Sequence, residues 1–209
     1  MTRAETKALT RARLLEAALH ILDEEGESGL TTTAVTRRAG IAQSSFYVHF
    51  ADMDDLVHEL IDSLVIERRR ATRQARQASL AAPGDQERFR DTFRVPIDQF
   101  VAKPALFRLL MRAQHDRSSP IGAWSRAVLA DTRSALVEDL HAVGMPKRTA
   151  SERRKAEMVA DGIMALTHSM IIGHLDGRYP DVEEIVDVLV AFSWGYFPML
   201  APGAEGLAT

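Results

Sequence analysis

Residues 31–50, TTTAVTRRAGIAQSSFYVHF, contain two short helical patterns that meet at Gly40. Thr31 is a good helix N-cap, and Val35 and Ala39 lie four residues apart on one apolar face. Gly40 favours the left-handed backbone that ends a helix and lets the chain reverse tightly. The stretch therefore predicts a helix-turn-helix, around which we interpret the rest of the chain.

The second helix of this motif begins with small or hydrogen-bonding residues, Ala42 to Ser45. Phe46 and Phe50 follow, four residues apart, and are spaced to pack behind the helix. This composition suits a recognition helix that lies against base edges and phosphates in a DNA groove. A plain helical hairpin, without a role in DNA binding, is the alternative.

Individual side chains of the motif have different expected roles. Gln43 favours adenine, because its amide offers a paired donor and acceptor, whereas Tyr47 and His49 can donate to phosphate oxygens. The residues predicted to bind DNA are Thr31, Thr33, Arg37, Ala42, Gln43, Ser44, Ser45, Tyr47 and His49.

The order Phe-Tyr-x-His-Phe after Ala-Gly-Ile, behind an amphipathic helix, resembles the signature of the TetR family of transcriptional regulators. The resemblance implies an all-α homodimeric repressor that binds a palindromic operator in double-stranded DNA. It also implies a small N-terminal helix-turn-helix domain, here residues 1–51, and a larger C-terminal helical domain for effector binding and dimerisation, residues 52–209. Met53 stands where many members have a phosphate-binding lysine, and Ala42 where the N-cap is usually serine.

Three stretches, GIAQSSFYVHFADMDDL, TRQARQ and KPALFRLLMRAQHDRSSPIGAW, resemble bacterial repressors of unsaturated fatty acid synthesis, of the DesT and FabR type. This resemblance covers residues 8–140. It implies control of fatty acid desaturation or unsaturated fatty acid synthesis, with a long-chain acyl-CoA or similar acyl thioester as effector. A repressor of an efflux or catabolic operon that senses another hydrophobic molecule is the alternative.

Composition limits the other classes of function. The 209 residues are 46% hydrophobic, enough for a real core, and the absence of cysteine excludes disulfides and thiolate chemistry. No membrane-spanning or targeting segment is expected, so we expect a cytoplasmic protein that associates with the nucleoid at its operator. The net charge of −3 disfavours a nonspecific DNA-compacting protein, although Arg3, Lys7, Arg11 and Arg13 predict a basic arm within the first thirteen residues.

An enzyme acting on a lipid or acyl thioester is the rival from another class. The sequence has no nucleophile elbow, no phosphate-binding glycine loop and no histidine pair at metal-binding spacing. His168 and His174 are six residues apart and do not share a helix face. We therefore expect no enzymatic activity, no catalytic residue, no metal and no cofactor.

Helical periodicity continues through the chain. We expect helices at 11–25, from Asp52 for about 25 residues, and at 85–102, 104–114, 120–143, 149–176 and 181–198. Pro96 is expected to kink its helix. The helix from Asp52 carries a run of arginines that we expect to be mostly solvated, some of them able to bind phosphate: Arg68, Arg69, Arg70, Arg73 and Arg76.

Large apolar side chains in the middle of the chain exceed what a small bundle requires. Such residues are more often core than ligand contacts, but flexible methionines suit a pocket for a long apolar molecule. An anionic head group is expected near Arg108, Arg112 and Arg117. The predicted ligand-binding residues are Phe100, Phe107, Leu110, Met111, Trp124, Val128, Met164 and His168.

The last two helices carry stripes that a monomer would have difficulty covering. One stripe consists mostly of small residues, which allow another backbone to come close, and the other is broadly apolar. Together they predict half of a four-helix bundle between two chains, the alternative being that both stripes pack internally. The predicted interface residues are Met158, Gly162, Ala165, Ser169, Gly173, Ile185, Leu189, Phe192 and Tyr196.

Overall fold

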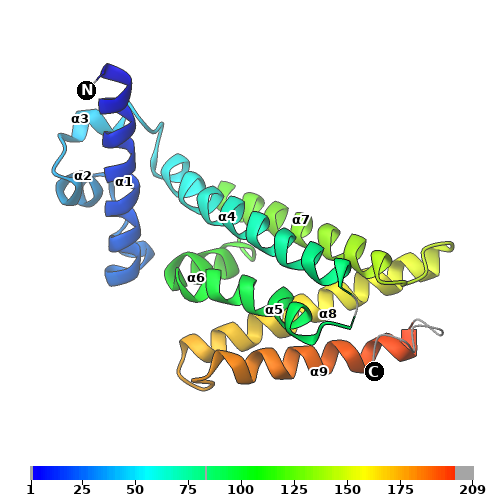
Figure 1. The fold of residues 1–209 in the computed structure, drawn as a ribbon. Coiled ribbons are helices and arrows are strands. Elements are labelled where there is room, and N and C mark those ends of the chain that lie inside the picture. Colours follow the sequence, from blue (N-terminus) through cyan, green and yellow to red (C-terminus); the bar gives the residue numbers. More distant parts are fainter. Residues whose placement is uncertain (1, 83, 201–209) are drawn as a thin grey trace. The chain divides into compact units, whose positions relative to one another are not determined.

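The computed structural model describes residues 2–82 and 84–200, except for the side chains of residues 63, 64, 67, 68 and 194–200. The described chain is helical and contains no strand (Figure 1). Its elements are α1 (Arg3–Glu25), the 3₁₀ helix η1 (Glu27–Gly29), α2 (Thr32–Ala39), α3 (Gln43–Phe46), α4 (Met53–Ala81), α5 (Gln86–Val101), α6 (Pro104–Ala113), α7 (Pro120–Ala142), α8 (Ala150–Leu175) and α9 (Val182–Leu200). The all-α prediction is confirmed.

The helices form two compact units that alternate along the chain. The N-terminal unit comprises Met1–Ile66 and Lys103–Arg126, and the C-terminal unit comprises Glu67–Ala102 and Ala127–Thr209. This division differs from the single boundary predicted after residue 51, because α6 returns to pack on α1. Helix α4 is continuous across the junction between Ile66 and Glu67.

The N-terminal unit is built on α1, which packs against α2 and α6. Its fully buried side chains include Leu14, Ile21, Phe46 and Phe107. The burial of Leu14 and Ile21 confirms the apolar stripe expected on the first helix.

Helix α1 starts at Arg3, so the start predicted for the first helix at residue 11 is wrong by eight residues. Thr2 and Glu5 form a capping box: the Glu5 amide donates to Thr2 Oγ1 at 3.2 Å, and the Thr2 amide donates to Glu5 Oε2 at 2.7 Å. This reciprocal pair satisfies two amides that the helix start leaves without partners. The early basic residues therefore belong to a helix surface.

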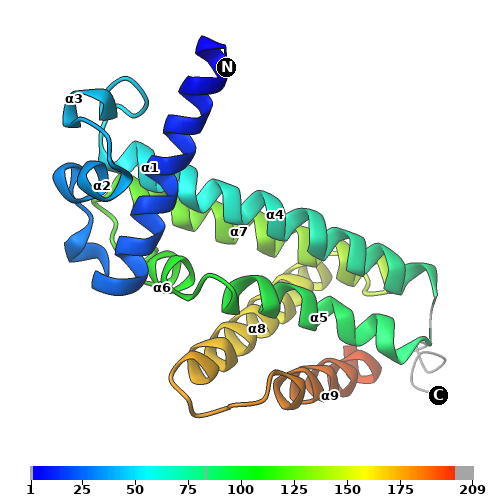
Figure 2. The ribbon, with the colours of Figure 1, turned by 60° about the vertical axis from the view of Figure 1, so that its left-hand side comes forward.

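The C-terminal unit contains α5, α8, α9 and the later parts of α4 and α7. Helix α5 packs against α8 and α9, and α8 packs against α9 (Figures 1 and 2). Leu140 and Met145, at and after the end of α7, form a cluster with Ala156 and Ala160 of α8. Two ion pairs, Arg69 with Asp131 and Arg76 with Asp139, join α4 to α7 and show that the two helices run in the same direction.

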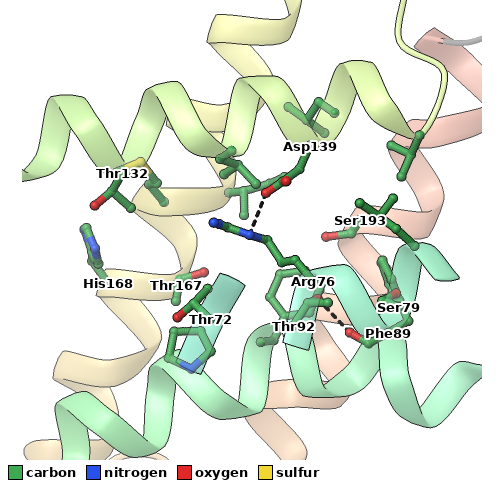
Figure 3. A pocket seen from close by; sticks show the side chains of 18 of the residues that line it. Thr72, Arg76, Ser79, Phe89, Thr92, Thr132, Asp139, Thr167, His168 and Ser193 are labelled. Carbon is green, nitrogen blue, oxygen red and sulfur yellow. Dashed lines mark hydrogen bonds and ion pairs between the residues drawn. The ribbon is translucent and has the colours of Figure 1, made fainter. Parts of the chain in front are cut away.

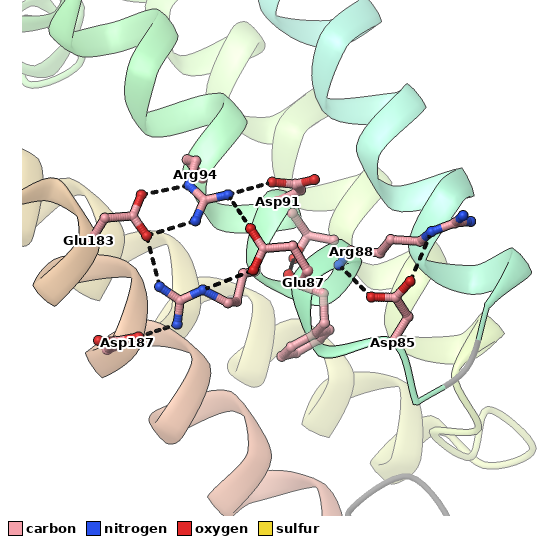
Figure 4. Close-up of polar contacts among 10 residues, drawn as sticks. Asp85, Glu87, Arg88, Asp91, Arg94, Glu183 and Asp187 are labelled. Carbon is pink, nitrogen blue, oxygen red and sulfur yellow. Dashed lines mark hydrogen bonds and ion pairs between the residues drawn. The ribbon is translucent and has the colours of Figure 1, made fainter.

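A cluster of charges joins α5 to α9 (Figure 4). Arg94 Nε lies 2.6 Å from Glu183 Oε1, and Arg90 Nη2 lies 2.8 Å from Glu183 Oε2. Arg90 also pairs with Asp187, and Arg94 with Glu87. The hydrogen bonds from Arg94 and then Arg90 lower the pKa of Glu183 to about 2. The carboxylate form of Glu183 is therefore stabilised by the contact between the helices.

The five predicted helices after residue 84 match α5 to α9 within two residues at each end. These helix ends were predictable because proline and glycine residues interrupt the helical pattern there. Pro104, for example, is the first residue of α6. Pro96 lies inside α5, where the predicted kink remains a prediction.

Candidate functional site

The turn between α2 and α3 has the geometry that its sequence predicts. Thr31 caps α2, since its hydroxyl accepts from the Ala34 amide at 3.2 Å. Gly40 follows with φ 64° and ψ 40°, the left-handed conformation that favours glycine. Arg13 of α1 donates to the Ala39 carbonyl at 2.6 Å, which satisfies one of the last carbonyls of α2. The helix-turn-helix is thus fixed by local caps and held against α1.

Helix α3 presents its polar residues outward from an aromatic support. Phe46 and Phe50 are buried with ring centres 5.6 Å apart, whereas the Tyr47 ring meets Phe46 edge-on at 5.4 Å and remains 60% exposed. Gln43 and Ser44 are exposed. Ala42 precedes the helix without any side-chain cap, as expected from its lack of a hydroxyl.

The predicted DNA-binding residues are mostly exposed on this unit. Two of them, Ser45 and His49, are half-buried, and the other seven are exposed: Thr31, Thr33, Arg37, Ala42, Gln43, Ser44 and Tyr47. Val48 was not predicted, although it is 64% exposed beside Tyr47. Its methyl groups are suited to contact a thymine methyl. The sequence could have pointed to Val48, because it is the variable position of the Phe-Tyr-x-His-Phe motif.

His49 lies in a more restricted environment than the sequence indicated. Burial lowers the pKa of His49, and the nearby charges of Lys7 and Arg11 lower it further. Its Nδ1 atom is buried and has no hydrogen-bond partner among the described residues. The imidazole is therefore neutral near pH 7 and keeps one N–H for donation.

The charge available to DNA is smaller than the arginine count suggests. Arg11 pairs with Glu59, donates to the His49 carbonyl and lies 4.3 Å from the centre of the Phe50 ring. On α2, Arg38 pairs with Glu24 at 2.6 Å, while Arg37 is exposed and has no ion pair within residues 2–82 and 84–200. Arg3 and Lys7 are likewise exposed and have no ion pair within the described residues.

A cavity of about 150 Å³ lies within the C-terminal unit, lined from α4, α5, α7, α8 and α9 (Figure 3). Three predicted ligand residues line it: Phe100, Met164 and His168. The rings of Phe100 and His168 meet edge to face, with centres 6.3 Å apart. These three residues bring together α5 and α8 around an apolar space.

The other predicted ligand residues do not line this cavity. Val128 is buried in the C-terminal unit outside the lining, and four residues belong to the N-terminal unit, where α6 supplies core: Phe107, Leu110, Met111 and Trp124. The arginines expected to hold an anionic head, Arg108, Arg112 and Arg117, also lie in the N-terminal unit. Helical periodicity identified the apolar faces of these helices, but it could not distinguish a face that packs as core from one that lines a cavity.

The cavity contains a charged pair that sequence reasoning missed. Arg76 Nε lies 2.6 Å from Asp139 Oδ2, although neither atom has hydrogen-bond geometry with any partner in the described chain. Burial raises the pKa of Asp139, while the charge of Arg76 lowers it. The sequence spacing was an available signal. Arg69 and Arg76 are seven residues apart, so they share a face of α4, and their partners Asp131 and Asp139 are eight residues apart, so they share a face of α7.

Helix α8 exposes the small-residue stripe that was predicted to meet a second chain. Met158 is 72% exposed, Gly162, Ala165 and Ser169 are exposed, and a Cβ atom on Gly162 would meet nothing within 4 Å. By length and composition alone, α8 is the one helix of the described chain that could cross a membrane, and 22% of its most apolar window is buried. Core helices pass the same test, so this indication is weak.

Several of the predicted interface residues are already covered within the chain. Gly173 is buried where a Cβ would lie 2.3 Å from the Tyr179 ring, and Ile185 and Leu189 are buried in the single chain. Ile185 and Leu189 are covered because α9 packs an apolar face on α5, and the interface itself stays a prediction. Phe192 is 51% exposed. Val188, which was not predicted for the interface, is 39% exposed. The side chain of Tyr196 lies outside the described residues.

Comparisons with known proteins agree with this organisation. Residues 14–60 match the model of a family described as bacterial regulatory proteins, tetR family. A TetR-family transcriptional regulator from Streptomyces coelicolor has a TM-score of 0.70 at 20% identity, over 91% of this chain and 95% of that chain.

Two further solved structures are named for fatty acid metabolism. The fatty acid degradation regulator FadR from Bacillus halodurans has a TM-score of 0.64 at 16% identity, over 87% of this chain and 94% of that chain. A protein from Clostridium perfringens, provisionally described as a fatty acid metabolism regulator, has a TM-score of 0.64 at 13% identity, over 90% and 96%. At these identities the likeness shows the fold.

Proposed function

We propose that this chain is a DNA-binding transcriptional regulator of the tetR family, and that it represses its target genes as a homodimer controlled by a hydrophobic effector. The observation that carries the proposal is the exposed polar surface of α3, where Gln43, Ser44 and Tyr47 stand on buried Phe46 and Phe50. The proposal involves no catalysis. Its setting is the cytoplasm, on the nucleoid.

A dimer explains how so small a recognition helix reaches useful specificity. One α3 has only four helical residues, so each half-site offers few base contacts. Two copies related by a two-fold axis recognise a palindrome whose half-sites lie roughly one helical turn, ~34 Å, apart. Each mismatched base pair then costs about 1–3 kcal/mol.

Continuity of α4 supports effector control. This helix begins at Met53, directly after the helix-turn-helix, and carries Thr72 and Arg76 of the cavity wall. A ligand that contacts the later turns of α4 therefore acts on the same helix that follows the DNA-binding motif. For a hundredfold change in operator affinity, the ligand must prefer one state over the other by ~2.7 kcal/mol.

An acyl chain is the first candidate effector. Phe100 and Met164 give the cavity apolar and flexible walls, and two structural neighbours are named for fatty acid metabolism. With the sequence resemblance to repressors of unsaturated fatty acid synthesis, these observations favour a long-chain acyl thioester and a role in fatty acid desaturation or unsaturated fatty acid synthesis.

A smaller hydrophobic effector, such as the signal of an efflux or catabolic operon, is the second candidate. The observation that favours it is the cavity volume of about 150 Å³. Pockets for drug-sized ligands measure ~300–1,000 Å³, so a long acyl chain requires the helices to separate, whereas a small ligand does not.

A titration on the DNA beside the gene tests these claims together. We expect specific binding to a palindrome in the absence of ligand, and a change in affinity when palmitoyl-CoA or oleoyl-CoA is added. Met164→Trp should fill the cavity and abolish the response while leaving ligand-free DNA binding intact.

Three results of that titration would contradict the proposal. A footprint without sequence preference would exclude a specific operator. Hydrolysis of the thioester by the purified protein would revive an enzymatic function. A normal response in Met164→Trp would place the effector elsewhere.

A further inference from the structure

The wall of the cavity contains charged and polar groups that a purely hydrophobic ligand would leave without a role. Arg76 and Asp139 face each other at 2.6 Å, with side chains 19% and 29% exposed. Burying such charges has a cost that an apolar wall would avoid. Asp139 is the one charged partner of Arg76 in the described chain, and its Oδ2 lies beside Nε.

The guanidinium therefore has unused donors. Its Nη1 and Nη2 atoms form no hydrogen bond within residues 2–82 and 84–200. A guanidinium has five N–H donors in a planar fork, and its geometry matches a carboxylate through two parallel hydrogen bonds. Figure 3 shows Arg76 in the middle of the lining, between Asp139 on one side and Thr72 and Thr167 on the other.

Thr72 supplies a second, independent indication of a polar ligand. It precedes Arg76 by one helical turn on α4, so the two side chains share a face. Thr72 is 7% exposed, and its hydroxyl has no hydrogen-bond partner in the part of the chain that the structure describes. Buried hydroxyl groups normally have a partner, because leaving one unsatisfied costs its lost hydration without any return.

The rest of the lining and the volume define the body of the ligand. Phe93, Pro96, Phe100 and Leu136 supply apolar wall. In another protein, an apolar cavity of about 150 Å³ binds benzene, which sets the scale for a group that fits without rearrangement.

We propose that this cavity binds a small organic monocarboxylate with an aromatic or short aliphatic body of about benzene's size, its carboxylate held by the Nη1 and Nη2 atoms of Arg76 and the hydroxyl of Thr72. Asp139 is a positioning residue that holds Arg76 through Nε. The inference rests on the proposed function in one respect, that this cavity is the effector site. It differs in ligand class, since a thioester has no free carboxylate on its acyl chain.

Calorimetric titration of the full-length protein with three acid and amide pairs tests the proposal. The probes are benzoate, phenylacetate and hexanoate, each compared with its neutral primary amide. We expect at least one carboxylate to bind tenfold or more tightly than its amide. If no carboxylate binds, or if each amide binds as tightly as its acid, the proposal is wrong.

Variants of the pair separate ligand binding from a purely structural role. Arg76→Gln should abolish the preference for the acid. Asp139→Asn should increase carboxylate affinity severalfold, because it removes a like charge and keeps an oxygen for Nε. A structural role alone predicts no such increase. The double variant Arg76→Gln, Asp139→Asn leaves no unpaired buried charge, so it should fold and show no preference.

Arg69 and Asp131 provide the matched control. They join the same two helices, with Nη2 and Oδ2 at 2.6 Å, but they are more exposed and do not line the cavity. Arg69→Gln and Asp131→Asn should leave the acid preference unchanged, and a loss there equal to that in Arg76→Gln would contradict the assignment. Operator binding is measured separately. Failure of carboxylates alongside a response to a neutral hydrophobic ligand would refute this inference and leave the regulator function standing.

Discussion

At the scale of single residues, we expect the exposed surface of α3 to separate base recognition from backbone contact. Gln43 presents an amide that pairs with adenine, whereas the Tyr47 hydroxyl is suited to a phosphate. Both side chains are exposed, and Tyr47 is oriented by its edge-on contact with the buried Phe46. The two residues should therefore affect DNA binding in different ways.

We expect Gln43→Ala to relax the sequence preference at one position of each half-site, at a cost of about 1–3 kcal/mol on the preferred base. Tyr47→Phe should weaken binding to all sequences about equally and leave the preference unchanged. Binding to an operator library with every single substitution measures both effects. Identical sequence profiles for the two variants would refute the division of roles.

His49 should make operator affinity depend on pH. Burial and the charges of Lys7 and Arg11 lower its pKa in the free protein, so it is neutral at pH 7. A DNA phosphate beside the ring raises the pKa again, so binding takes up a proton and tightens as the pH falls from 8 to 6. Each unit of pKa difference between the bound and free states allows up to about a tenfold change.

His49→Gln is the control for this effect, because glutamine keeps a donor but does not titrate. We expect its operator affinity to vary much less over the same pH range at constant salt. An unchanged pH profile in this variant would assign the effect to another group.

At the scale of elements, the charge cluster between α5 and α9 should stabilise their contact in a pH-dependent way. Arg94 and Arg90 lower the folded-state pKa of Glu183 to about 2, below its ordinary value. A group with a depressed folded pKa contributes stability above its unfolded pKa and loses it as the pH falls through the folded value. The contribution should therefore be constant near neutrality and disappear between about pH 4.5 and pH 2.

Glu183→Gln should lower the free energy of unfolding near pH 7 by about 1 kcal/mol or less, because the ion pair between Glu183 and Arg94 is partly exposed and screened by solvent. Denaturant unfolding at pH 7 and pH 3 measures the change, which should shrink at the lower pH. Glu184→Gln is the matched control, since the neighbouring Glu184 is exposed and has no ion pair among the described residues. An equal effect of both substitutions would exclude the cluster as the cause.

At the scale of the whole molecule, the exposed stripe of α8 and the outer face of α9 should form the dimer interface. Gly162→Leu should dissociate the dimer, because the side chain would stand where a partner backbone comes close. It should not destabilise the single chain, since the site is open and leucine favours helix over glycine by about 1 kcal/mol. Phe192→Asp should also dissociate the dimer by burying a charge.

Sedimentation analysis of both variants measures the oligomeric state, and an intact dimer in both would place the interface elsewhere. Gly173→Ala serves as a contrast, because its Cβ would lie 2.3 Å from the Tyr179 ring of the same chain. We expect it to lower stability without a direct effect on association. Comparison of the two glycines therefore separates the open part of the stripe from the part that Tyr179 of the same chain covers.

Local signals in the sequence were sufficient wherever a structure depends on neighbouring residues. The cap at Thr31, the left-handed Gly40 and the aromatic pair Phe46 and Phe50 all act within twenty residues, and each occurs as predicted. The ends of α5 to α9 were also predictable, because proline and glycine stop a helix whatever surrounds it. The start of α1 was the exception, where the Thr2 and Glu5 capping box was overlooked.

What the sequence determined by itself was therefore the helical architecture and the helix-turn-helix, since caps, turns and periodicity are properties of short segments. Only the tertiary structure decided which apolar faces became core, cavity wall or open surface. Phe107 and Phe100 are both apolar aromatic residues at helical spacing, yet the first is core of the N-terminal unit and the second lines the cavity. Likewise, Arg76 acquired its partner Asp139 only because α4 and α7 run side by side, and periodicity within one helix cannot specify which other helix will pack against it.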